Sequence, residues 1–499
     1  MQYGMVTCAT FSSWPRQPES TPETLMSESA SQPAVTDPVI SLSHPAHSAL
    51  TELFGERLRT DAATLAEWGR DWTRSFTVAP SAVVFPASEE EVVRLVRLAR
   101  AHGLALVPSG GRTGLSGGAV APAGEVVVSF DRMNRILDFD PAGQLVRCEA
   151  GVITGLLQAF AEEHDLFYPV DFASSGSSQI GGNVATNAGG IKVIRYGMTR
   201  DWVAGLRVVT GTGEVLDVGK GLVKNATGYD LRHLMIGSEG TLGLITEVTI
   251  RLRRPPGPLS VLVLGLPEFP VVMDVLAAFQ QRLDVTAFEF FSELALGKVL
   301  DRTGLARPFE SECPFYVLIE FETDGDADAA LAVFEHCVEQ GWALDGVMSQ
   351  SEEQARRLWR LREDISETLS RWTPYKNDIA VRVGAVPAFL AEVDALAERA
   401  YPDLEVVWFG HIGDGNLHLN ILKPDALPQA EFYARCHQVS KEVFEVVRRH
   451  GGSISAEHGV GLLKRDYLQY SRPPEEIALL KAIRGIFDPD GILNPGKLL

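Results

Sequence analysis

Three features are scarce in this sequence: closely spaced cysteines, long apolar runs and positive charge. The five cysteines lie far apart and never form a CxxC pair, which argues against a disulfide framework and a thiolate zinc site. No apolar run approaches the roughly 20 residues of a membrane-spanning helix, and the N-terminus lacks the charged and then apolar order of a secretion signal. We therefore expect a cytoplasmic protein without a transmembrane segment.

Lysine and arginine number 45 against 65 aspartate and glutamate residues, which gives a formal net charge of -20 at pH 7. This charge repels the phosphates of nucleic acids and anionic lipid headgroups, so neither is an expected partner. A small anion can still bind where a few arginine and lysine side chains converge. The composition, 45% hydrophobic and 22% charged, is that of a folded soluble protein, and 499 residues are too many for one hydrophobic core.

The pattern along the chain divides it into four parts. Residues 1–45 are rich in Ser, Thr, Pro, Gln and Ala, bury little apolar surface, and are predicted to be a disordered tail. Residues 46–256 begin with a helical lead-in and then alternate short apolar strands with helices, up to a break at two prolines. Residues 257–430 alternate strands with amphipathic helices, which predicts an antiparallel α+β domain, and residues 431–499 are mainly helical.

The second part contains the clearest local prediction. Ser88 before three glutamates predicts that a helix starts at Glu89, and Gly103 predicts its end. The flanking apolar runs, residues 82–86 and 104–111, are expected to be strands. This order of strand, helix and strand places the glycine-rich loop that follows at the end of a strand.

Three segments of this part are rich in glycine and other small residues. They are PSGGRTGLSGGAV (108–120), residues 169–190, and a run from Gly237 into a strand that ends near Leu252. Glycine lets the backbone approach a ligand closely, and successive free N–H groups form a concave anion site. Any one loop could equally be a turn without a ligand, and the spacing matches neither the Rossmann nor the Walker pattern. Three such loops in one domain, however, could line a long, flat ligand that carries a polyphosphate.

A second candidate site is rich in histidine. His411 and His418 flank a short turn after an apolar run, and Glu457 and His458 lie in a loop flanked by glycines. Two imidazoles and one carboxylate with an open fourth position form the ligand set of catalytic zinc and of related divalent metals. Each histidine by itself could instead be a structural residue with satisfied hydrogen bonds. If three of these groups bind a metal, the fourth can accept a proton, although the spacing does not assign the roles.

Taken together and in order, these segments resemble the FAD-dependent 2-hydroxyacid dehydrogenases of the vanillyl-alcohol oxidase superfamily. PSGGRTGLSGG resembles the pyrophosphate loop of the family, SSGSSQIGGNVATNAGGIKVIRYG its isoalloxazine segment, and NATGYDLRHLMIGSEGTLGLITEVT the stretch that completes the FAD fold. HIGDGNLHLN and SAEHGVGLLKRDYL resemble its metal and catalytic loops. The resemblance, from about Trp72 to Leu499, implies an α+β fold. A two-part FAD-binding domain of the PCMH type is expected before an antiparallel substrate domain and a C-terminal helical segment that closes over the flavin.

The resemblance also implies roles for individual residues. His411, His418 and Glu457 would hold zinc, and His458 would take the proton of the substrate hydroxyl while a hydride passes from the substrate carbon to FAD. FAD would be bound by residues of the three glycine-rich segments: Pro108, Ser109, Gly110, Gly111, Arg112, Thr113, Gly114, Ser116, Gly117, Ser175, Gly181, Gly182, Asn183, Thr186, Asn187, Gly189, Gly190, Gly240 and Ile245.

The family pattern places substrate-binding groups at Arg362, Ser366, Lys376 and Asn420, with His458 beside them. Arg362 and Ser366 are four residues apart and so share one side of a helix, where the arginine offers a local cation for a carboxylate. Without the resemblance, Arg362 would be read as the partner of an acidic neighbour on a solvated helix. The family more usually has threonine where Ser366 stands, so a hydroxyl is retained there.

Arg112 stands where flavinylated relatives carry a histidine, so non-covalent FAD is expected. Within the family the pattern is most similar to the branch that oxidises D-2-hydroxyglutarate to 2-oxoglutarate, which makes a 2-hydroxy dicarboxylate the expected substrate. The alternatives are a D-lactate, D-malate or glycolate dehydrogenase and a flavin- and metal-binding subunit without turnover. Electron-transfer flavoprotein or a quinone is the expected electron acceptor, and a homodimer is among the expected assemblies.

Overall fold

The computed structural model describes residues 43–73, 75–323 and 327–499, and the tail predicted for residues 1–45 lies outside this part up to position 42. Helix α1 (His44–Phe54) includes residues 44 and 45, the last two of the segment that was predicted to be a tail. Pro45 fits in the first turn of α1, where its missing N–H leaves no helical hydrogen bond unmade. Within the described ranges, no helix is long and apolar enough to cross a membrane.

The first sheet has the strand order β1-β2-β4-β3. Strand β4 pairs in parallel with β2 and β3, and β1 is antiparallel to β2. Helix α3 (Glu89–His102) joins β2 to β3, so the predicted order of strand, helix and strand is confirmed. Ser88 caps this helix by accepting the N–H of Glu91, and Gly103 ends it at a φ of 63°. The strands are β1 (Leu58–Arg59), β2 (Ala82–Val84), β3 (Leu106–Ser109) and β4 (Val126–Ser129).

The second sheet has five antiparallel strands in the order β5-β6-β9-β7-β8. It shares one hydrophobic core with α1, α3 and the first sheet. Its strands are β5 (Ile136–Asp140), β6 (Leu145–Glu149), β7 (Val203–Val209), β8 (Val215–Val218) and β9 (Leu244–Arg251). The helices before and between these strands are α2 (Ala62–Trp68), α4 (Thr154–Glu162), α5 (Ile180–Thr186), α6 (Val193–Tyr196), α7 (Thr199–Trp202) and α8 (Arg232–Met235).

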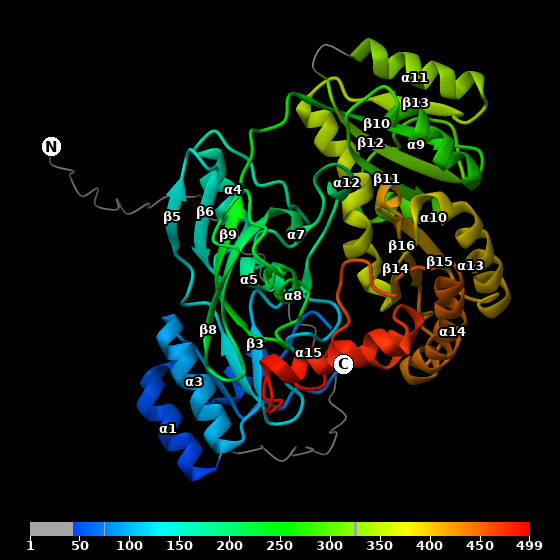
Figure 1. Cartoon of the computed structure of the whole chain (residues 1–499). Helices are drawn as coiled ribbons and strands as arrows, with labels where there is room; N and C mark the ends of the chain where they lie inside the picture. The colour runs from blue at the N-terminus through cyan, green and yellow to red at the C-terminus, as the bar shows by residue number, and fades with distance from the viewer. Residues whose placement is uncertain (1–42, 74, 324–326) are drawn as a thin grey trace, which may run out of the picture. The chain divides into compact units, whose positions relative to one another are not determined.

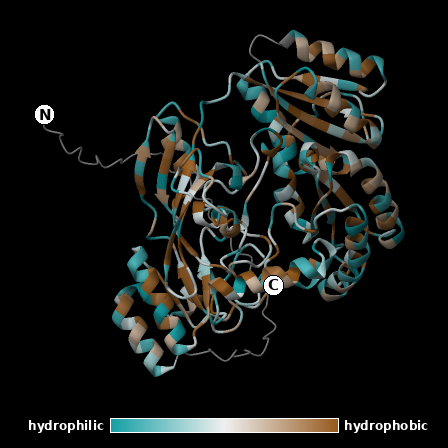
Figure 2. Ribbon diagram, in the orientation of Figure 1, coloured by the Kyte–Doolittle hydropathy of each residue, from teal (hydrophilic) through white to brown (hydrophobic). Residues whose placement is uncertain are grey.

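The third sheet has seven strands in the order β13-β10-β12-β11-β15-β16-β14, and every pair is antiparallel, as predicted for this region (Figure 1). Its central strands consist mostly of hydrophobic residues (Figure 2). The strands are β10 (Leu259–Leu266), β11 (Val285–Ser292), β12 (Phe315–Glu322), β13 (Asp345–Met348), β14 (Tyr375–Ala380), β15 (Val406–Gly410) and β16 (Asn416–Ile421).

Helices cover both faces of this third sheet. Helices α9 (Val272–Gln280), α11 (Ala327–Glu339), α13 (Val386–Ala400) and α14 (Gln429–Arg449) pack on one face. Helices α10 (Glu293–Thr303) and α12 (Glu352–Leu369) pack on the other. The C-terminal helical segment comprises α14 and α15 (Pro474–Phe487), while the exact division of the chain at residues 256 and 430 stays a prediction.

Candidate active site

The glycine-rich segments lie against one another. A Cβ on Gly111 would lie 2.1 Å from the carbonyl oxygen of Ser177, and a Cβ on Gly240 would lie 2.5 Å from the ring of Pro108. Only glycine allows two backbones, or a backbone and a ring, to approach this closely. The structure therefore brings together three segments that lie more than 45 residues apart in the sequence.

Several of the predicted FAD-binding residues use their side chains to hold these loops. Asn183 donates to the hydroxyl of Thr154 at 2.7 Å, and the hydroxyl of Ser175 donates to Asp171 at 2.7 Å. Ile245 contributes its side chain to the core beneath β9. The hydroxyls of Thr186 and Ser116 donate to the carbonyls of Gly182 and Gly459. Asn187 accepts the N–H of Arg200 at its side-chain oxygen, and the N–H of Gly117 donates to the hydroxyl of Thr73. Gly181, Gly189 and Gly190 pack closely on neighbouring atoms.

Other members of the set have open space or unused polar atoms. A Cβ on Gly182 would meet nothing within 4 Å, and among the described residues the buried hydroxyl of Ser109 has no hydrogen-bond partner. Arg112 has a φ of 58° and places its guanidinium 4.7 Å from the ring centre of Trp68. The open space at Gly182 and the unpartnered hydroxyl of Ser109 fit a flat ligand with phosphates, as FAD is.

The histidine loops converge on one carboxylate. Nε2 of His411 lies 3.8 Å from Oε2 of Glu457, and Nε2 of His418 lies 3.7 Å from its Oε1. Nε2 of His458 lies 3.4 Å from the same Oε1. The turn between the first two histidines needs Gly415, whose φ is 85° and whose Cβ would lie 2.1 Å from a carbonyl oxygen. Three imidazole nitrogens therefore face one carboxylate, as a divalent metal site with an adjacent base requires.

The other nitrogen of each imidazole faces a second buried carboxylate. Nδ1 of His411 lies 2.8 Å from Glu289, whereas Nδ1 of His418 and Nδ1 of His458 lie 3.8 and 3.4 Å from Asp378. Glu289 and Asp378 are each 1% exposed. The hydrogen bond to Glu289 orients His411 with Nε2 free for a metal, and the carboxylate of Asp378 lies on the Nδ1 side of the other two rings, so the donor set fits a divalent ion.

Burial and neighbouring charges set the protonation of these groups. Burial lowers the pKa of His418 to about 3, which keeps its imidazole neutral at neutral pH. Burial also acts to lower the pKa of His411, but the carboxylates of Glu289 and Glu457 outweigh it and raise this pKa to about 9. Burial acts to raise the pKa of Glu457, but His411 and His458 outweigh it and lower this pKa to about 2. A metal ion would therefore displace a proton from His411 when it binds.

Asp378 organises the loop that carries Glu457 and His458. One of its carboxylate oxygens accepts the N–H groups of Ala456, Glu457 and His458, each at 3.1 Å. Burial alone would raise the pKa of Asp378, but electrostatic interactions with the adjacent His458 and Lys464 hold it well below its usual range. An ionised Asp378 thus fixes the backbone of the loop that carries Glu457 and His458, and it faces the imidazoles of His418 and His458.

The register of the third sheet explains why these residues meet. Asp378 pairs with His418 and Lys376 pairs with Asn420, so these four side chains project from the same face of the sheet. Phe409 pairs with His418, which places the side chain of Phe409 on that face as well. The face is the one covered by α10 and α12, and it is opposite the larger core formed with α13 and α14.

The predicted substrate-binding residues differ in their exposure. Arg362 is 6% exposed, lies 2.8 Å from Glu289 and stacks over the ring of Phe409, so it is not the solvated partner of an adjacent acid. Within the described ranges, Nε of Arg362 and both amide atoms of Asn420 are buried without a hydrogen-bond partner. Ser366 and Lys376 are exposed. Arg362 and Asn420 thus leave buried polar atoms free for a ligand, and Ser366 and Lys376 are open to solvent.

Three residues of the site were missed in the sequence. Glu289 interrupts the apolar run AFEFF, and Asp378 lies in a strand between polar and apolar residues. Lys464, from the KRDYL stretch, is near Asp378 at 3.7 Å and donates to Ser455 at 3.1 Å. A charge within an apolar strand was the available signal for Glu289, because a buried charge needs a partner. Asp378 and Lys464 gave no comparable signal.

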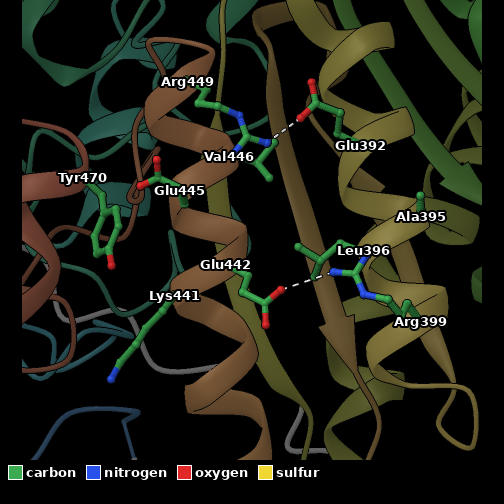
Figure 3. Close-up of a pocket in the computed structure, with 10 residues that line it drawn as sticks. All are labelled: Glu392, Ala395, Leu396, Arg399, Lys441, Glu442, Glu445, Val446, Arg449 and Tyr470. Carbon is green, nitrogen blue, oxygen red and sulfur yellow. Dashed lines mark hydrogen bonds and ion pairs between the residues drawn. The ribbon is translucent and has the colours of Figure 1, made fainter.

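A surface groove between α13 and α14 lies on the opposite side of the sheet (Figure 3). Its charged side chains pair across the groove: Arg449 lies 2.7 Å from Glu392, and Arg399 lies 3.2 Å from Glu442. None of the predicted site residues lines this groove. Lys441 and Glu445 take no part in these two pairs, but none of the buried polar atoms that lack a hydrogen-bond partner in the described ranges belongs to the groove.

Comparison with known proteins identifies the family. The FAD binding domain model matches residues 80–219, and the model of the C-terminal domain of FAD linked oxidases matches residues 256–498. D-2-hydroxyglutarate dehydrogenase of Stutzerimonas stutzeri is 64% identical over 89% of this chain and 96% of its own length. The chain belongs to the FAD-dependent 2-hydroxyacid dehydrogenase family. The family member of the same name from Xanthomonas citri pv. viticola is 57% identical over 89% of this chain and 94% of its length.

The family resemblance predicted from the motifs is thereby confirmed, and the protein is an FAD-dependent dehydrogenase. Among solved structures, p-cresol methylhydroxylase matches with a TM-score of 0.70 at 16% identity, over 92% of this chain and 97% of that one. At this identity the likeness concerns the fold alone. It confirms the predicted α+β fold of the vanillyl-alcohol oxidase type.

Proposed function

We propose that this protein oxidises D-2-hydroxyglutarate to 2-oxoglutarate with FAD and zinc. The observation that carries the proposal is the shared sheet face, where the unpartnered polar atoms of Arg362 and Asn420 lie with the imidazoles that converge on Glu457. A 2-hydroxy acid needs a cation for its carboxylate and a base for its hydroxyl. This face offers both. The names of the two bacterial relatives support D-2-hydroxyglutarate as the particular substrate.

His411, His418 and Glu457 would hold the zinc ion. When bound, zinc lowers the pKa of a substrate hydroxyl. His458 then takes the hydroxyl proton at Nε2, because its Nδ1 faces Asp378 at 3.4 Å and the charge of that carboxylate stabilises the imidazolium. FAD supplies the acceptor for the hydride that leaves the substrate carbon.

Arg362 and Asn420 orient the substrate in this proposal. The guanidinium binds the distal carboxylate, which D-lactate lacks, through the nitrogen that Glu289 does not occupy, and the Asn420 amide donates to a substrate oxygen. Lys376 and Ser366 are exposed and meet the distal carboxylate from the open side. FAD is held without a covalent bond, because Arg112 offers no nucleophile at the position of the flavinylated histidine.

An anaerobic spectral titration of the purified flavoprotein tests the proposed function. D-2-hydroxyglutarate should bleach the oxidised flavin at low concentration, whereas D-lactate, D-malate and L-2-hydroxyglutarate should require far more or fail. A preference for D-lactate would keep the chemistry and reject the substrate. No bleaching by any hydroxy acid, in protein shown to contain FAD and zinc, would favour a non-catalytic subunit.

The substitution Arg362→Ala should harm the dicarboxylate more than a monocarboxylate. Hydrogen bonds to charged groups contribute about 1.5–3 kcal/mol, so kcat/KM for D-2-hydroxyglutarate should fall at least about tenfold further than kcat/KM for D-lactate. The ratio is the relevant quantity, because losing Arg362 also leaves Glu289 without its cation and weakens both reactions. Arg360→Ala is the matched control, since Arg360 lies on the same helix but pairs with Asp364 near the surface. Equal losses for both substrates would reject Arg362 as the group that reads the second carboxylate.

The remaining assignments complete the proposal. A soluble carrier such as electron-transfer flavoprotein, or a quinone, reoxidises the flavin. The net charge of -20 suits a cytoplasmic enzyme that does not associate with anionic membranes or nucleic acid. A homodimer is the assembly to test first by light scattering.

A further inference from the structure

The loop that presents Glu457 and His458, residues 455–461, is held from two sides. Asp378, in the third sheet, accepts three of its N–H groups. The second set of contacts comes from the glycine-rich segments of the FAD-binding part. Ser116 donates its hydroxyl to the carbonyl of Gly459 at 2.9 Å, and a Cβ on Gly461 would lie 2.1 Å from the carbonyl oxygen of Ser116. The proposed metal and base loop therefore touches the predicted cofactor loops directly.

Glu239 makes the strongest of these contacts. Its two carboxylate oxygens accept the N–H groups of Val460 and Gly461, each at 2.7 Å. The side chain is buried, and Lys464 supplies a nearby positive charge. Each carboxylate oxygen thus has its own backbone donor, which orients the following turn of the loop.

The backbone of Glu239 is tied to the segments that resemble the flavin-binding loops. Its N–H donates to the carbonyl of Ala185 at 2.8 Å. Its carbonyl accepts the side-chain amide of Asn494 at 2.7 Å, and the same amide donates to the carbonyl of Gly118 in the first glycine-rich segment. The residue stands directly before Gly240 and has a φ of 51°, a conformation that costs any L-residue energy and suits glycine. A glycine at this position would remove the strain but also the carboxylate, so the side chain has a purpose that offsets the strain.

We propose that Glu239 is a positioning residue that links the predicted flavin-binding segment to the loop that presents Glu457 and His458. The inference rests on the proposed function only for the roles of those two residues. Because one residue joins both segments, ordering of the flavin-binding segment and ordering of the loop stabilise each other. FAD binding should therefore slow the opening of the loop, and removal of the Glu239 carboxylate should weaken that effect.

Hydrogen exchange tests this link without any turnover. In Glu239→Gln, an NH₂ group replaces one of the two carboxylate oxygens and faces a backbone N–H, so one hydrogen bond is lost. Exchange of the amides of Val460 and Gly461 should accelerate about tenfold or more. Adding FAD to wild-type apoprotein should slow these amides, and the slowing should be much smaller in the variant. Glu247→Gln is the matched control, because Glu247 lies in β9 and pairs with Arg147 towards solvent.

A kinetic measurement separates positioning from general destabilisation. Stopped-flow reduction reports only on molecules that hold flavin, so loss of folded protein does not change the observed rate. Glu239→Gln should lower the limiting rate of flavin reduction about tenfold or more and leave the substrate dissociation constant near the wild-type value, because Arg362 and Asn420 lie on other elements. Ser116→Ala removes one weaker contact to the same loop and should lower the limiting rate by a smaller factor. This variant replaces Glu239→Gln in the kinetic experiment if Glu239→Gln does not fold.

Unchanged exchange at Val460 and Gly461 in Glu239→Gln would overturn the inference. Equal slowing by FAD in wild type and variant would also overturn it. These outcomes are independent of the substrate. If wild-type flavin is not bleached by any hydroxy acid, the proposed function fails, while the exchange experiment still decides whether Glu239 links the two segments.

Discussion

The substitution His458→Gln should lower the limiting rate of flavin reduction by D-2-hydroxyglutarate about 10²–10⁴-fold, the usual contribution of a general base. Glutamine retains a polar group that can face Asp378, so the loop that carries it keeps its main anchor through three backbone N–H groups. It cannot take a proton at neutral pH. The loss should therefore appear in the reduction rate, and the flavin content and the melting temperature should change little.

His437→Gln is the control for this experiment. His437 lies on α14, on the opposite side of the third sheet, and its ring contacts the hydroxyl of Tyr375 at 3.2 Å. Both variants are measured by anaerobic stopped-flow spectroscopy across a range of pH. The rate of the His458 variant should rise with pH, because hydroxide replaces the missing base. A wild-type rate in His458→Gln would exclude this residue as the proton acceptor.

Much of the fold could be predicted because its determinants are local. The helix from Glu89 was defined by a serine cap and a glycine end, and the antiparallel strands of the third sheet were visible as apolar runs of the correct length. Glycine-rich loops could be recognised from composition, because close contacts such as those at Gly111 and Gly240 require glycine. The contact between those loops could not be predicted, because it depends on the tertiary structure and not on local composition.

The site could be predicted in part. His411, His418, Glu457 and His458 were identified by their chemistry and by the resemblance, and the structure places them together. The carboxylates behind the imidazoles could not be assigned, because the pairing of Asp378 with His418 depends on the register between β14 and β16.

Arg362 shows why a single sequence leaves some assignments open. Acidic residues follow it directly, and an arginine in such a run is usually solvated. The helix instead turns Arg362 inward, where its partner is Glu289 on β11, 73 residues earlier in the chain. Nothing in the local sequence specifies this rotation of α12; it follows from the burial of Leu361 and Ile365 against the third sheet.

Removing the metal should abolish flavin reduction by the substrate while leaving FAD bound, because none of the proposed metal ligands is among the predicted FAD-binding residues. Dialysis against a chelator should give yellow protein that D-2-hydroxyglutarate does not bleach, and added zinc should restore the reaction.

Substitutions at the site should weaken metal binding in an order set by the geometry, with the largest effect at a direct ligand. Glu457→Gln replaces the charged ligand on which three imidazoles converge and should lose the metal, as measured by elemental analysis.

Glu289→Gln tests the same site from one step further away. Glu289 contacts His411 at Nδ1, and changes to such outer partners usually weaken metal binding about 10–100-fold, so this variant should bind zinc weakly and recover at high zinc concentration. Glu392→Gln, in the surface groove between α13 and α14, should behave as wild type. Full bleaching by substrate in protein free of divalent metal would reject the metal mechanism. In that case the cluster around Glu457 would have to act through its carboxylates and imidazoles alone. There would then be no reason to expect a larger effect from Glu457→Gln than from Glu289→Gln.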